Sequence, residues 1–197
     1  VAANTGSSFS RWTGACSGSG LCQVRLRRDR TVTANFDVQT FELIVQKSGA
    51  GQGTVISAPA GINCGTDCAQ DYSFGTNVAL TAAPASGHTF AGWSGACSGN
   101  GTCSVTMDQV RNVTARFEVR QVQLTVSRSG PGSGTVTSMP GGINCGAQCV
   151  AAYQFGTQIT LNAMAAVGSG FSGWTGDCSG TNACTLTLDG DKTVQAT

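Results

Sequence analysis

Charged side chains are scarce in this chain. Asp, Glu, Lys and Arg make up 11% of its 197 residues, and the formal net charge is +1. A nucleic-acid-binding protein would instead carry a basic face that neutralises phosphates. The basic residues that do cluster are Arg25, Arg27, Arg28 and Arg30. We therefore predict no nucleic-acid partner. We interpret the arginine cluster as a solvated turn, with a site for an anionic partner as the alternative.

The residues of a repeated catalytic or metal site are also lacking. The chain has one histidine, His88, and serines stand at its equivalents in the other repeats, Ser7 and Ser169. Its aspartates do not recur at fixed intervals, so neither a carboxylate pair nor a calcium loop is indicated. Serine and threonine are abundant, but no base accompanies them to form a nucleophile. We predict a protein that is not an enzyme and that has no cofactor and no metal.

No apolar run in the sequence is long enough to span a membrane, and no leader segment is recognisable. We therefore expect no direct insertion into a membrane. The chain begins and ends inside a repeated pattern, because Val1 aligns with Ala82 and Thr197 aligns with Arg116. We expect it to be a segment of a longer array.

What the chain does contain is a long internal repeat. Trp12, Trp93 and Trp174 are evenly spaced, and the cysteines around them keep the same interval. A period held without an insertion indicates a repeat architecture. The predicted segments are 1–38, the C-terminal half of a first repeat; 39–120, a second repeat; and 121–197, a nearly complete third repeat.

The ten cysteines indicate an oxidising compartment, and hence an extracellular or cell-surface location. They form Cys-x3-Cys and Cys-x5-Cys motifs. Pairing within each motif leaves no thiol over and joins Cys16–Cys22, Cys64–Cys68, Cys97–Cys103, Cys145–Cys149 and Cys178–Cys184. Pairing between the two motifs of a repeat is one alternative, and a zinc site is another, although structural zinc favours closer pairs of ligands that converge.

Alternation of apolar and polar residues predicts short strands throughout. Phe41, Leu43 and Val45 alternate with polar residues, as in a half-buried strand. No window longer than a turn has helical periodicity. Further strands are expected at 54–56, 69–74, 78–82, 89–93, 103–107 and 113–117. The fold class is therefore all-β, with tandem small modules of six or seven strands per repeat.

The junctions between repeats show a change of side. Val32, Ala34, Phe36 and Val38 form the expected buried set of one strand, on even positions, whereas the next set, from Phe41, is on odd positions. A shift of one residue inverts the two faces of a strand and implies a bulge or bend. The same shift recurs near Arg120-Gln121, and no Gly-, Pro- or Ser-rich linker intervenes. We predict modules joined by continuous strands in a stiff array.

Several motifs resemble one known family. Pro-x-Gly-Ile-Asn-Cys-Gly, Tyr-x-x-Gly-Thr, Phe-x-Gly-Trp-Ser-Gly-x-Cys-Ser-Gly and Val-Thr-Ala-x-Phe, which occur at 59–65, 72–76, 90–99 and 113–117, are similar to the divergent internalin B-type B-repeat. The resemblance covers the whole chain. It implies a compact, β-grasp-like all-β module (a small β-sandwich is the alternative) in secreted or surface proteins of bacteria, without enzymatic activity. The cysteine pairs distinguish this chain from listerial B-repeats.

The repeated tryptophans, Trp12, Trp93 and Trp174, have two interpretations. They are either anchors of a small core or exposed platforms that stack on sugars.

Taken together, the repeat, the cysteines and the family resemblance predict a non-enzymatic extracellular array that forms a stalk, surface fibre or filament of a bacterial surface or secreted protein. Its partners would be further repeats of the same chain or neighbouring subunits. The alternative is a carbohydrate- or receptor-binding adhesin module that contacts glycans or a host surface through the Gly-Trp loops.

Overall fold

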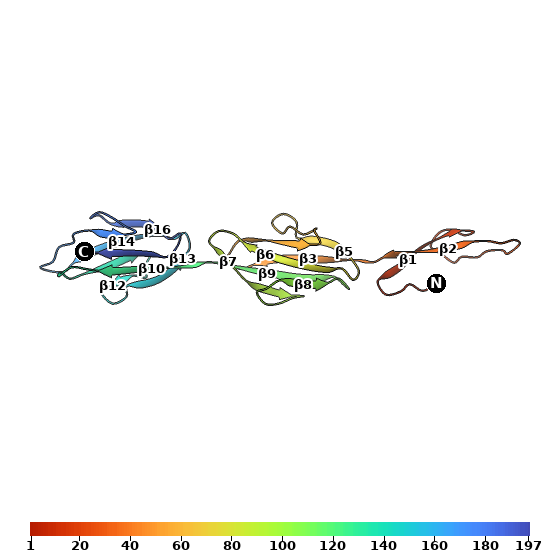
Figure 1. Cartoon of the computed structure of the whole chain (residues 1–197), viewed down its shortest axis with the longest axis horizontal. Coiled ribbons are helices and arrows are strands. Elements are labelled where there is room, and N and C mark those ends of the chain that lie inside the picture. Colours follow the sequence, from red (N-terminus) through yellow and green to blue (C-terminus); the bar gives the residue numbers. More distant parts are fainter. The chain divides into compact units, whose positions relative to one another are not determined.

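A computed structural model describes residues 1–197, all in strands, turns and irregular segments (Figure 1). The all-β prediction is confirmed, since the chain forms strands β1 to β17 and no helix. No helix is therefore present that could cross a membrane. The chain divides into two compact units. The first comprises 1–49, 53–84 and 90–117, and the second comprises 50–52, 85–89 and 118–197.

The central repeat supplies most of the first unit and folds as two sheets. Its strands are β3 (Thr40–Ser48), β4 (Gly53–Ala58), β5 (Ala69–Ser73), β6 (Asn77–Pro84), β7 (His88–Gly95), β8 (Cys103–Thr106) and β9 (Arg111–Val119). One sheet has the order β5-β3-β9-β7 and the other has the order β4-β6-β8. Both sheets contribute to one apolar core, so the module is a small β-sandwich.

The alternation read from the sequence decides which side chains enter this core. Leu43 and Val45 on β3, and Val113, Ala115 and Phe117 on β9, are buried, while the residues that alternate with them are more exposed. β3 and β9 pair in parallel, with Val45 opposite Val113. Their apolar side chains therefore share one face of the sheet and pack on the other sheet.

The second unit repeats this arrangement. Its strands are β10 (Gln121–Arg128), β11 (Gly134–Met139), β12 (Asn144–Cys145), β13 (Val150–Gln154), β14 (Gln158–Ala165), β15 (Trp174–Gly176), β16 (Cys184–Thr187) and β17 (Lys192–Ala196). They form sheets of order β13-β10-β17-β15 and β12-β11-β14-β16. β10 and β17 pair in parallel, with Val126 opposite Val194, and both residues are buried.

The half repeat at the N-terminal side has fewer strands and a less buried interior. β1 (Ser7–Gly14) and β2 (Val32–Val38) form a two-stranded antiparallel sheet. Phe36 and Val38 are 43% and 60% exposed, so the prediction that they are buried is wrong. Their side of the sheet lacks the strands that cover the equivalent residue Phe117, which is 1% exposed in the central repeat.

A single residue separates the strands at each junction between sequence repeats. Gln39 lies between β2 and β3, and Arg120 lies between β9 and β10. At Arg120 the side changes as expected, because Phe117 is buried at an odd position and Val122 and Leu124 are buried at even positions. The strands are therefore continuous apart from one residue that shifts the alternation.

Candidate functional site

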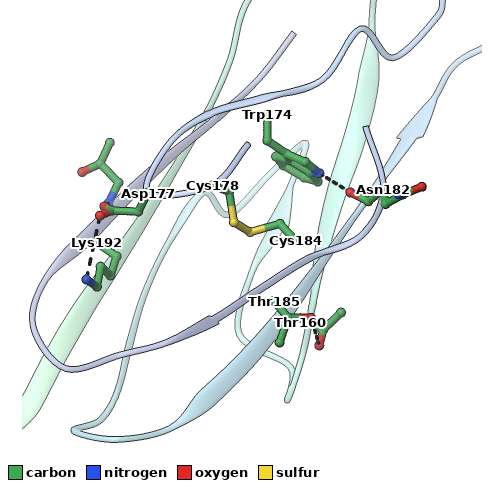
Figure 2. The surroundings of a disulfide bond; sticks show 9 residues. Thr160, Trp174, Asp177, Cys178, Asn182, Cys184, Thr185 and Lys192 are labelled. Atoms are coloured by element: carbon green, nitrogen blue, oxygen red, sulfur yellow. Dashed lines mark hydrogen bonds and ion pairs between the residues drawn. A yellow bond between two sulfur atoms is a disulfide. The ribbon is translucent and has the colours of Figure 1, made fainter. Parts of the chain in front are cut away.

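The three tryptophans each close a Cys-x5-Cys loop. In the central repeat the Trp93 indole Nε1 donates to the carbonyl of Gly101 at 2.7 Å, and the Trp93 backbone N–H donates to the carbonyl of Gly99 at 2.8 Å. Trp174 makes the same indole bond to the Asn182 carbonyl at 2.7 Å (Figure 2). Trp12 bonds to the Gly20 carbonyl at 3.0 Å. The ring thus fixes a loop that its glycines would otherwise leave free to move.

A disulfide joins the ends of each of these loops. Cys97 pairs with Cys103, whose side of the bridge is buried at the start of β8, and their Cα atoms are 5.7 Å apart. The other two bridges of this type have Cα separations of 5.8 Å at Cys16–Cys22 and 6.0 Å at Cys178–Cys184. Each loop is therefore attached to the fold by a covalent bond and by an indole hydrogen bond, and Figure 2 shows both for the loop closed by Cys178–Cys184.

The burial of the tryptophans bears on the two roles considered for them. Trp93 and Trp174 are 5% and 3% exposed, and Trp12 is partly exposed. The Trp93 ring packs on Phe90 with centroids 4.9 Å apart. A sugar platform needs an open ring face, so this geometry favours the role of core anchor for Trp93 and Trp174.

The Cys-x3-Cys loops have their own cross-links. Cys64 pairs with Cys68 and Cys145 pairs with Cys149, with Cα separations of 4.3 and 4.2 Å. The structure therefore contains all five bridges of the within-motif pairing, and no cysteine is free. Cys64 and Cys145 are fully buried, so each loop is fastened to the core from one side.

A hydrogen-bond network that the sequence analysis missed holds the same loops. The Ser57 and Tyr72 hydroxyl oxygens are 2.8 Å apart, and the Ile62 backbone N–H donates to Ser57 Oγ at 2.9 Å. The third repeat has the equivalent contacts, which are Ser138–Tyr153 at 2.9 Å and Ile143–Ser138 at 3.0 Å. The serine, tyrosine and isoleucine all recur at the same interval as the tryptophans, and this was the signal available in the sequence.

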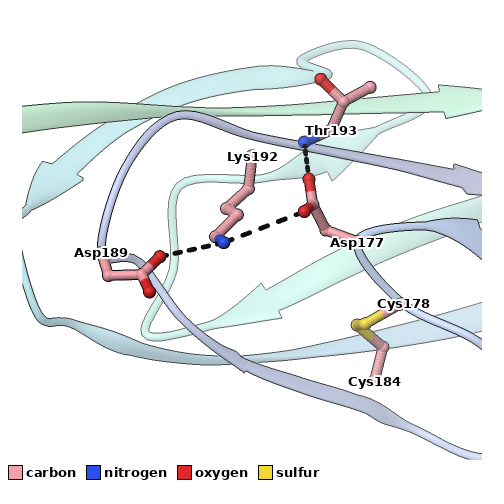
Figure 3. A network of polar contacts seen from close by, with 6 residues as sticks. All are labelled: Asp177, Cys178, Cys184, Asp189, Lys192 and Thr193. Carbon is pink, nitrogen blue, oxygen red and sulfur yellow. Dashed lines mark hydrogen bonds and ion pairs between the residues drawn. A yellow bond between two sulfur atoms is a disulfide. The ribbon is translucent and has the colours of Figure 1, made fainter.

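One ionic cluster lies beside the last disulfide of the second unit. Lys192 Nζ is 2.9 Å from Asp189 and 3.8 Å from Asp177, and Asp177 accepts a bond from the Thr193 N–H at 2.7 Å (Figure 3). The hydrogen bond from Lys192 and its charge lower the pKa of Asp189, and the same bond raises the pKa of Lys192. The central repeat keeps the equivalent ion pair, Arg111–Asp108 at 2.6 Å, and lacks the third member, because alanine stands at the position of Asp177.

This cluster gives a testable pH dependence. Replacing Lys192 with glutamine should return the pKa of Asp189 toward its ordinary value, because the positive charge is lost and the donor that remains is a neutral amide. The depressed carboxyl pKa stabilises the fold above the ordinary Asp pKa, and that contribution disappears as pH falls through the lowered pKa. A carboxyl ¹³C NMR titration would measure the shift. Arg111→Gln, in the central repeat, should leave the pKa of Asp189 unchanged, and an equal response to both variants would contradict the assignment.

The cysteines and tryptophans singled out in the sequence act as cross-links that hold the loops of each repeat. No group of three or more His, Cys, Asp or Glu side chains is placed to hold a metal ion. The arginine cluster lies in an irregular segment between β1 and β2, and its four side chains, of Arg25, Arg27, Arg28 and Arg30, are exposed. The features that recur in every repeat are the tryptophan, its phenylalanine partner and the disulfide-closed loop.

Comparison with known proteins agrees with the repeat. The model of the divergent InlB B-repeat domain matches residues 1–40, 45–121 and 124–197, which together span nearly the whole chain. The chain belongs to the divergent InlB B-repeat family. The resemblance noted from the sequence is therefore confirmed, and the three matched segments confirm that B-repeats are arranged in tandem here.

Other comparisons add less. No curated protein matches this B-repeat chain. Among solved structures, the Bacillus anthracis TIE protein is similar over 85% of this chain and 36% of its own, with 9% sequence identity and a TM-score of 0.45. The chain thus spans about a third of the length of that protein.

Proposed function

We propose that this chain is a structural segment of an extracellular or surface-exposed bacterial protein, where its repeats form a stalk or fibre and perform no catalysis. Membership of a B-repeat family supports a surface repeat module. The five disulfides support an oxidising, extracellular environment. In this role the disulfide-closed loops resist unfolding and proteolysis. The repeats act as spacers that extend from the bacterial surface.

The observation that carries the proposal is the way each junction residue is held. In the first unit the Gln39 N–H donates to the Gly6 carbonyl at 2.9 Å, and the Gln39 carbonyl accepts from the Phe74 N–H at 2.8 Å. In the second unit Arg120 is bonded in the same way, to Gly87 at 2.9 Å and to Phe155 at 2.8 Å. A residue whose N–H and carbonyl are both hydrogen-bonded resists bending of the backbone. Such resistance at the junctions is what a stalk needs.

At both junctions a phenylalanine packs against a turn glycine, and the two glycines are equivalent in the repeat. A Cβ atom added to Gly6 would lie 2.0 Å from the Phe74 ring, and one added to Gly87 would lie 2.2 Å from the Phe155 ring. The Arg120 guanidinium also stands over the Phe155 ring, 4.9 Å from its centroid. The junction therefore requires glycine for close approach as well as for its left-handed backbone.

Gly87→Ala tests whether this packing limits motion at the junction. The alanine would displace the turn from Phe155, so the amides of Arg120 and Phe155 should exchange with solvent at least about tenfold faster. Small-angle scattering of the variant should show a wider distribution of conformations than that of the wild-type chain. Gly156→Ala is the matched control, because Gly156 has φ +83° against +76° at Gly87 but has nothing within 4 Å of an added Cβ atom.

Equal effects of the two substitutions would mean that only backbone strain matters. Wild-type scattering typical of freely jointed modules would reject the stalk.

A role as a glycan- or receptor-binding module is the competing function. It predicts saturable binding on a glycan array that is lost in the partly exposed Trp12→Ala variant, whereas a stalk predicts no such binding.

A further inference from the structure

The turn before the last strand of each repeat differs in charge between the repeats. In the central repeat Asp108 and Arg111 form an ion pair across this turn, with Arg111 Nη2 2.6 Å from Asp108 Oδ1. In the third repeat Asp189 and Lys192 form the equivalent pair at 2.9 Å. The half repeat lacks the acid, because Arg27 stands at the position of Asp108 and Asp189. Its turn is the arginine cluster, which consists of Arg25, Arg27, Arg28 and Arg30.

The arginine cluster keeps the backbone conformation of this turn. In each repeat the chain bends at the position of Arg27 and at the next one. The backbone N–H at the first bend position donates to the carbonyl two residues earlier. The donor and acceptor residues are Arg27 and Arg25 at 3.2 Å, Asp108 and Thr106 at 3.2 Å, and Asp189 and Thr187 at 3.1 Å. The half repeat therefore changes the charge of the turn and keeps its backbone hydrogen bond.

The guanidinium groups of the arginine cluster are free to bind a partner. All four side chains are exposed, and none of them forms an ion pair or a side-chain hydrogen bond. The exposure belongs to the position in the repeat, because Asp108 and Gln109 are also exposed in the central repeat, where both sheets are present. The turn thus presents its side chains to solvent in every repeat.

The charge of the arginine cluster is not balanced locally. Four arginines and one aspartate, Asp29, give residues 25–30 a formal charge of +3, whereas the whole chain carries +1. Like charges at short distance repel one another, and an ion pair of the kind formed at Asp108 would relieve that repulsion. In the half repeat a bound anion would supply the negative charge that the aspartate supplies in the other two repeats.

The grouping of the arginines favours a polymeric anion over a single ion. One exposed contact is weak, because water and salt screen it. Several linked contacts are stronger, since each one formed raises the effective concentration of the next anionic group. Arginine also binds tetrahedral oxyanions through two parallel N–H bonds. Four arginines within six residues therefore match a polymer whose anionic groups are closely spaced.

We propose that the arginine cluster binds an anionic polysaccharide with closely spaced sulfate or phosphate groups. The choice of a polysaccharide rests on the extracellular location proposed above. A nucleic acid fits less well, because its bases stack on aromatic side chains and no aromatic residue lies between Gly20 and Thr31. Two sources of such groups, a sulfated and a phosphorylated polymer, share this chemistry and are separated by the probes used.

Binding of the full chain to three polymers tests the proposal. The probes are a heparin oligosaccharide, which carries sulfates, and poly(glycerol phosphate), which carries phosphates. We expect saturable binding that weakens as salt is added, and the tighter probe identifies the group that is recognised. Hyaluronan is the control, because its anionic groups are carboxylates that are widely spaced. It should bind at least about tenfold more weakly, since fewer contacts form at once.

Arg27→Asp tests the site itself. Aspartate stands at this position in both other repeats, so the turn should keep its fold. The variant should weaken binding at least about tenfold, because a charge-assisted contact is lost and a negative charge faces the polymer. Arg11→Asp is the matched control, since it makes the same change at an exposed arginine of β1 and should leave the affinity nearly unchanged. Hydrogen exchange at β1 and β2 would verify that both variants are folded.

The reverse substitution builds the site in a complete repeat. Asp108→Arg together with Gln109→Arg places two more arginines beside Arg111 in the central repeat. This variant should gain a second binding site for the tighter probe, measured as an increased stoichiometry. An unchanged stoichiometry in a folded variant would contradict recognition by the arginine turn.

Four other results would overturn the proposal. Equal weakening by Arg27→Asp and Arg11→Asp would show that binding follows the net charge alone. Equal affinity for hyaluronan, or tighter binding of single-stranded DNA than of either probe, would reject the class of ligand. Loss of binding in a folded Trp12→Ala chain would assign the polysaccharide to the Gly-Trp loop. A chain that binds none of the polymers would reject the site and leave the scattering test of the stalk unaffected.

Discussion

Replacing Trp93 with alanine is expected to lower the free energy of unfolding of the central repeat by about 3–5 kcal/mol, the range for large buried aromatic side chains. The Trp93 ring is 5% exposed and packs on Phe90. Its removal would leave a cavity and would also free the Gly101 carbonyl from the indole hydrogen bond. Hydrogen exchange at β3 and β9 would report the loss within the repeat concerned.

Two further variants separate the contributions. Trp93→Phe keeps most of the apolar volume and loses the indole donor, so it should cost less, with about 1 kcal/mol attributable to the hydrogen bond. Trp12→Ala removes the partly exposed equivalent and should leave the central repeat unaffected. A Trp93→Ala chain that keeps its stability but loses glycan binding would contradict the anchor role and support the platform.

Removing a disulfide should give the second largest effect. Replacing both Cys97 and Cys103 with alanine is expected to destabilise the central repeat by about 2 kcal/mol, because the closed loop is short and restricts the unfolded chain only modestly. Cys103 is 1% exposed, so alanine there also leaves a small gap in the core. Denaturant unfolding with exchange measured at β7 and β8 would quantify the change.

The half repeat provides the control for this prediction. Replacing Cys16 and Cys22 with alanine removes a bridge of the same sequence separation, 6 residues, from a segment in which every apolar residue is at least partly exposed. The core of the central repeat should not respond.

Peptide mapping without reduction tests the pairing itself. It should recover Cys97 linked to Cys103, and recovery of a Cys64–Cys97 link would contradict the pairing.

Features that depend on neighbouring residues were predictable from the sequence. Alternation at Phe41, Leu43 and Val45 located β3, since successive side chains of a strand point to opposite faces. The constant interval between the tryptophans located the repeats, because equivalent residues recur in each. Cysteines four and six residues apart lie within reach of one another whatever the rest of the chain does, so local pairing could be proposed.

Features that depend on distant residues were decided by the tertiary structure. Alternation cannot tell whether another sheet covers a face, so Phe36 and Phe117 look alike in the sequence, yet one is exposed and the other buried. The Ser57–Tyr72 bond joins β4 of one sheet to β5 of the other, and only the packing of the two sheets brings these strands together. The sequence by itself determined the strands, the repeat and the local cross-links. Burial and parallel pairing required the fold, because each arises where segments far apart in the chain meet.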